Sequence, residues 1–153
     1  MNELFHFFST FALIQTSFPA SAPHAGLIAA GVTLIDLDHL PYWLRSRKQI
    51  SQTLRRGLSV ECRSVLHELG GIILFTLLAG VALMAGVGVA LVSAVYFSVM
   101  LHLAVDFTTG SSRPFRPLSD REVRSPLAPT TLRQQVALQT VGTVLVAALF
   151  LSL

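Results

Sequence analysis

The longest uncharged stretch of the chain covers residues 69–105, which is 37 residues without Asp, Glu, Lys or Arg. As one α-helix it would be about 55 Å long at ~1.5 Å per residue, whereas the apolar core of a bilayer is only ~30 Å thick. Gly86 and Gly88 lie near its middle and favour a turn. We therefore expect a helical hairpin, with one membrane span at about residues 66–84 and the next at about 89–107.

The remaining apolar segments predict three further helices. The chain is 52% hydrophobic and 12% charged, whereas soluble domains carry about 25% charged residues. Residues 136–153 predict a third span. The N-terminal region is apolar but contains Pro19 and Pro23, and proline ends helices. We expect a short membrane helix before Pro19 and another at about residues 24–37, which is tilted, partial or packed inside the bundle.

The segment that ends at Ala20-Ser21-Ala22 has the length of a signal peptide, but no positive charge precedes it and Pro23 follows directly. We expect the segment to be retained. The sequence thus predicts an all-α, polytopic membrane bundle of four to five helices that forms a single domain over residues 1–153. The single cysteine, Cys62, excludes an internal disulfide and any Cys-based zinc motif.

All eleven Lys and Arg residues lie in two polar loops, at about residues 41–65 and 108–133. Two predicted spans separate these loops, so both lie on the same side of the membrane. The positive-inside rule makes that side cytoplasmic. The basic charge of the chain therefore indicates topology and contact with membrane lipids, and we expect no nucleic-acid partner.

Ionisable side chains within membrane segments are costly and usually functional. His102 and Asp106 stand four residues apart, which places both on one helix face, where they can share a divalent ion. Imidazole and carboxylate suit zinc at ~2.0–2.2 Å, and also manganese or iron. On the expected topology, three groups of ionisable side chains reach the cytoplasmic face: those at residues 36–39, that of His67, and those of His102 and Asp106. The candidate ligands are His24, Asp36, Asp38, His39, His67, His102 and Asp106.

Several of these residues also allow plainer interpretations. His102 with Asp106 could be a simple hydrogen-bonded pair, and His6 is interpreted as an amphipathic residue at a wet boundary. His24 lies about 18 Å from Asp36 along a straight helix, so it joins the site only if that helix breaks at Gly26 or Gly31 or lies in the interface.

Two further side chains could assist chemistry at this face. Glu68 follows His67 and could act as an acid or a base. On a helix, however, its side chain would point away from that of His67, which disfavours this role. Arg113 and Arg116 follow Asp106 and could hold a substrate phosphate, because arginine favours bidentate contact with phosphate.

The motifs resemble those of a bacterial inner-membrane family of metal-dependent hydrolases, the LexA-regulated YdjM family. Residues 36–41 resemble its D-x-D-H-P element with Leu40 inserted, and residues 102–110 resemble its H-x-x-x-D-x-x-T-x-x-G element. Residues 62–68 resemble its H-R-G-x-T-H-S element, with Cys62, Ser64 and Glu68 in place of its His, Gly and Ser. His24 resembles the N-terminal histidine of the family, so the resemblance covers roughly residues 24–117.

This resemblance implies a metal-dependent hydrolase at the cytoplasmic face of the inner membrane. The His/Asp order is also similar to that of the helical zinc phospholipase C group, which implies a phospholipid or other phosphoester substrate. We expect Asp38, His67, His102 and Asp106 to be the first ligands, and Asp36, His39 and His24 to orient them or to bind a second ion. Asp36 could instead act as general base, and Asp36 and His39 are the candidate catalytic residues.

Two other kinds of function are open. The ligands could form a non-enzymatic metal site, either a structural staple or a site for transport or sensing. The chain could also be a small membrane scaffold that binds a partner through its basic loops.

Overall fold

The structure, a computed structural model, describes residues 3–41, 64–125, 127–129 and 131–152. Its described residues are mostly helical, which confirms the all-α class. The α-helices are α1 (Glu3–Ser17), α2 (Ala25–Thr33), α5 (Leu69–Met84), α6 (Val89–Thr109) and α7 (Leu132–Ser152). The 3-10 turns are η1 (Pro19–His24), η2 (Leu34–His39) and η4 (Val65–His67).

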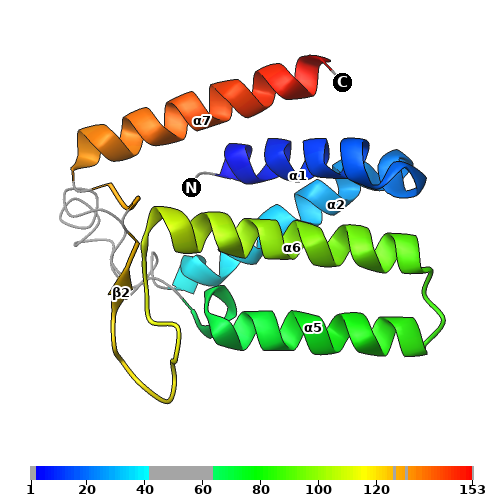
Figure 1. Cartoon of the computed structure of the whole chain (residues 1–153), viewed down its shortest axis with the longest axis horizontal. Helices are drawn as coiled ribbons and strands as arrows, with labels where there is room; N and C mark the ends of the chain where they lie inside the picture. Colours follow the sequence, from blue (N-terminus) through cyan, green and yellow to red (C-terminus); the bar gives the residue numbers. More distant parts are fainter. Residues whose placement is uncertain (1–2, 42–63, 126, 130, 153) are drawn as a thin grey trace.

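The predicted hairpin is present as α5 and α6, which run antiparallel and pack side by side (Figure 1). Gly86 lies in the turn between them with a φ of 81°, a conformation that favours glycine because it lacks a Cβ atom. The first arm begins three residues later than expected, at Leu69, because residues 65–67 form the separate turn η4.

The predicted break at Pro19 and Pro23 is also present, as η1. The next helix differs from the expectation of a helix over residues 24–37. It is α-helical only over Ala25–Thr33 and then tightens into η2. A 3-10 turn brings residues i and i+3 onto the same side. Asp36 and His39 therefore share one side of η2.

The core lies where α1, α2 and α6 meet. Ile14, Ile28, Val99 and Leu103 are buried there. On the outer side α7 covers α1, and the ring centroids of Phe150 and Phe11 lie 4.7 Å apart. In Figure 1 the N-terminal end of α1, the C-terminal ends of η2 and α6, and the N-terminal end of α5 all lie at the same end of the bundle.

The described residues of the second predicted loop include regular structure. It begins at Gly110, because α6 continues to Thr109, and it contains an antiparallel pair of short strands, β1 (Ser111–Ser112) and β2 (Val123–Arg124). The final helix starts at Leu132, four residues before the expected residue 136. Most of the first loop, including Cys62, lies outside the described residues.

Two helical segments of the described chain are long and apolar enough to cross a membrane, Pro19–His39 and Val89–Thr109. Leu69–Met84 and Val136–Ser152 are shorter apolar helices.

Candidate metal centre

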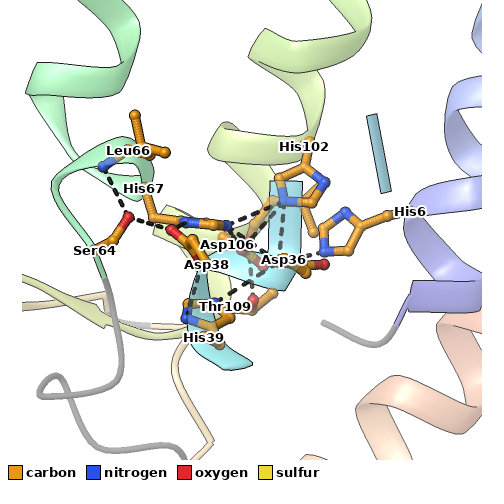
Figure 2. Close-up of polar contacts among 11 residues, drawn as sticks. His6, Asp36, Asp38, His39, Ser64, Leu66, His67, His102, Asp106 and Thr109 are labelled. Carbon is orange, nitrogen blue, oxygen red and sulfur yellow. Dashed lines mark hydrogen bonds and ion pairs between the residues drawn. The ribbon is translucent and has the colours of Figure 1, made fainter. Parts of the chain in front are cut away.

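Polar side chains from four elements meet at the end of the bundle where these elements converge (Figure 2). Residues far apart in the chain are thereby brought within hydrogen-bonding distance. The cluster contains His6 from α1, Asp36, Asp38 and His39 from η2, His67 from η4, and His102 and Asp106 from α6.

The helix α6 supplies two neighbouring groups. His102 and Asp106 are 1% and 5% exposed, and their spacing of four residues places both on the buried face of the helix. His102 Nε2 lies 3.7 Å from Asp106 Oδ2. The predicted pairing of these residues on one helix face is therefore present.

The turn η4 holds His67 in position. Ser64 caps it, since its Oγ accepts a hydrogen bond from the backbone N of Leu66 at 3.0 Å. Gly71 allows α5 to begin directly against this turn, because a Cβ atom at that position would lie 1.8 Å from the carbonyl oxygen of Leu66. A glycine is thus required where the turn packs against the first turn of α5.

One ligand atom from each of four side chains lies within 4.8 Å of the other three, in Asp36, His67, His102 and Asp106. His67 Nε2 lies 3.1 Å from Asp36 Oδ1, 3.4 Å from His102 Nε2 and 3.7 Å from Asp106 Oδ2. His102 Nε2 lies 3.4 Å from Asp36 Oδ1. Ligands at ~2.0–2.1 Å from a tetrahedral ion lie about 3.3 Å from one another. The residues present therefore fit a divalent metal ion.

Asp38 holds His67 from the opposite side of the ring. His67 Nδ1 lies 2.9 Å from Asp38 Oδ2, and Ser64 Oγ donates a hydrogen bond to the same oxygen. Metal-binding histidines usually donate their second ring N–H to such an acceptor. From the sequence we expected Asp38 among the first ligands, and Asp36 as a residue that orients them, binds a second ion or acts as general base. The distances favour the reverse assignment, because η2 turns Asp36 toward the converging nitrogens.

The carboxylates also change the electrostatics of His67. Burial lowers its pKa, but the hydrogen bonds with Asp36 and Asp38 outweigh burial and raise the pKa to about 9. Without a metal, the imidazole is therefore protonated at neutral pH. A cation that binds Nε2 must displace this proton.

His6 also belongs to the cluster, although the sequence did not indicate a role for it there. It is 1% exposed, its Nε2 lies 3.2 Å from Asp106 Oδ1, and its ring stacks on that of His102 with centroids 3.9 Å apart. Its interpretation as an amphipathic boundary residue is therefore wrong. The available signal was the spacing of His6, Thr10 and Ile14, which places one buried stripe along α1.

His24 is not brought to this cluster. The helix α2 continues unbroken past Gly26 and Gly31, so His24 lies at the opposite end of it from η2 and is exposed. Its predicted role required either a break in this helix or a helix that lies in the membrane interface, and α2 has no break over Ala25–Thr33.

The remaining candidates lie beside the cluster. Glu68 is buried. Its Oε1 accepts a hydrogen bond from the backbone N of Arg113 at 2.8 Å. This contact ties the segment after α6 to η4. The guanidinium of Arg113 lies 3.8 Å from Asp120, and Arg116 is half-buried three residues further on.

The chain matches the family model of the YdjM inner membrane proteins over residues 1–153. No curated protein and no solved structure matches it significantly. The expected resemblance is thereby confirmed. This chain belongs to the YdjM inner membrane protein family.

Proposed function

We propose that the chain is a metal-dependent hydrolase of phosphoesters, acting at the cytoplasmic face of the inner membrane. The convergence of Asp36, His67, His102 and Asp106 on one point carries this proposal. Burial of several ionisable groups is unfavourable unless they pair with one another or bind a metal. Zinc suits this donor set best, and manganese or iron would also fit it.

The membrane arrangement that we propose is multi-pass, with residues 1–153 forming one domain. Apolar side chains cover the outward faces of α5 and α7; Leu77 is 63% exposed and Leu145 is 65% exposed. Such faces suit lipid tails better than water. The loops at residues 41–65 and 108–133 carry all the basic residues and would lie in the cytoplasm.

The bound ion would polarise a phosphoryl oxygen and lower the pKa of a water molecule. Asp36, His67, His102 and Asp106 would hold it, and Asp38 would orient His67. His39 suits the general base, because its side chain is 18% exposed and its Nε2 lies 3.7 Å from Asp36 Oδ1. Asp36 remains an alternative base only if it leaves the metal.

Arg113 and Arg116 would bind the phosphate of the substrate. The backbone of Arg113 is hydrogen-bonded to Glu68, the residue next to His67. A guanidinium anchored there can reach an anionic group beside the metal and bind it through two parallel hydrogen bonds.

A structural metal site is the second candidate, and one observation favours it. Four protein ligands complete a tetrahedral zinc shell, whereas catalytic zinc usually has three and leaves one position open. In that case the ion would fasten α6 to η2 and η4 and no reaction would occur.

One experiment distinguishes the hydrolase from the structural metal site. The purified protein is reconstituted in vesicles, loaded with zinc, manganese or iron, and assayed for phosphate release from phosphatidic acid and from p-nitrophenyl phosphate. We expect metal-dependent release that His102→Ala abolishes and that His24→Ala, its exposed control, retains. Bound metal that raises the melting temperature without any release would establish the structural site instead.

A further inference from the structure

An apolar groove lies between α2, α5 and α6, with a cavity volume of about 490 Å³. Ligand pockets commonly measure about 300–1,000 Å³. The described residues that line it are apolar except Tyr96, whose hydroxyl lies within hydrogen-bonding distance of Thr76 at 3.2 Å. The groove therefore offers a ligand contact area without charge or free hydrogen-bonding groups, which suits a hydrocarbon chain.

One end of this groove is lined by residues that lie close in sequence to two proposed metal ligands. Its lining includes Ile35, which precedes Asp36, and Val99, which lies one helical turn before His102. The other end lies at Ala82 and Val87, beside the turn of the hairpin. Along α6 the lining extends from Leu91 to Val99, about 12 Å at ~1.5 Å per residue. The groove thus leads away from the centre along the hairpin.

We propose that this groove holds an acyl chain of a phosphorylated membrane lipid whose headgroup lies at the metal centre. The inference rests on the proposed function and names its substrate class. Charge complementarity supports this occupant. The described residues that line the groove carry no charge, whereas one end of the groove adjoins the proposed ligands Asp36 and His102, where a bound cation would suit an anionic phosphate. A water-soluble phosphoester would leave the groove without a role.

Small residues make the groove accessible to a test. Gly31 lines it, and a Cβ atom added there meets no atom within 4 Å. Gly31→Phe should therefore fill the groove without disturbing the backbone of α2. Gly26 lies on the same helix, is equally free of contacts and is not among the lining residues. Gly26→Phe is the matched control.

The binding experiment uses the full chain in phosphatidylcholine vesicles that contain a little phosphatidic acid with a photoreactive diazirine in its acyl chain. We expect cross-links at lining residues such as Phe75 and Tyr96. Gly31→Phe should reduce them at least tenfold, and Gly26→Phe should not. Equal labelling of the outer face of α7, or equal labelling by diazirine phosphatidylcholine, would overturn the inference by identifying bulk lipid contact.

A chain-length series separates the inference from the proposed function. For short-chain substrates supplied as monomers in water, removing two methylene groups from the acyl chain should lower kcat/KM about tenfold, because each methylene then passes from water into the groove, and Gly31→Phe should abolish this dependence. Hydrolysis that is equally fast for long-chain and short-chain substrates, without groove cross-links, would refute the groove but not the hydrolase. Specific cross-links without any hydrolysis would refute the hydrolase and leave the groove as a lipid-binding site.

Discussion

The two ends of the α5–α6 hairpin differ in the polarity and the burial of their side chains. At the turn, residues 85–88 carry no polar side chain and are exposed. At the other end, His67, His102 and Asp106 are all buried. Burying such groups is costly unless they are paired or bind a cation. The contrast supports the proposed metal site at the polar end, and it agrees with the proposal that the apolar end contacts lipid.

The largest effect should come from Asp106, whose carboxylate three histidines approach. Asp106→Ala removes one proposed ligand and the partner of His6, so metal measured by plasma mass spectrometry should fall from about one ion per chain to nearly none. The control is Asp120→Ala, whose side chain is 82% exposed and should retain full metal content. Full occupancy in Asp106→Ala would remove the functional distinction between the two ends.

The second prediction separates the two aspartates of η2. Asp38→Asn should weaken metal binding by about 10–100-fold, as expected for loss of a partner that orients a ligand. Asp36→Asn should weaken it more, because Asp36 Oδ1 faces both His67 and His102. Competition with a fluorescent chelator measures both affinities. The opposite order would restore Asp38 as the direct ligand.

The third prediction concerns pH. In the metal-free protein the pKa of His67 is raised to about 9, so the proton must leave before Nε2 can bind metal. Apparent affinity should therefore fall by about tenfold for each pH unit below 9, since one proton competes with the ion. Calorimetry in buffers of different ionisation enthalpy should detect about one proton released per ion from this residue. An affinity that stays constant between pH 6 and pH 8 would contradict this assignment.

The smallest effect should come from His6. Its hydrogen bond to Asp106 and its stacking on His102 position groups that α6 already holds. His6→Ala should weaken metal binding about fivefold, which corresponds to one hydrogen bond of ~1 kcal/mol. His6→Gln keeps a donor and should recover part of the loss. If both variants bind like the wild type, α1 contributes packing alone.

The hairpin and the pair His102 and Asp106 could be predicted because each depends on local spacing: the length of an uncharged stretch and a separation of four residues. The roles of Asp36 and Asp38 could not, since they depend on where α2 tightens into a 3-10 turn. The spacing of His6, Thr10 and Ile14 could have indicated a buried face of α1, but the partner of His6 could not be predicted, because it lies 100 residues away. Local pattern thus predicts the elements, whereas long-range packing decides which side chains meet.

X-ray absorption of the zinc-loaded protein tests most directly whether one cation binds at the point where the four donors converge. If the ion binds there, we expect a first shell of nitrogen and oxygen alone at ~2.0–2.1 Å. We also expect outer-shell scattering from two imidazoles, and Asp106→Ala should abolish this signal. A sulfur neighbour at ~2.3 Å, or a shell without imidazole, would mean that the ion binds elsewhere and would contradict the account.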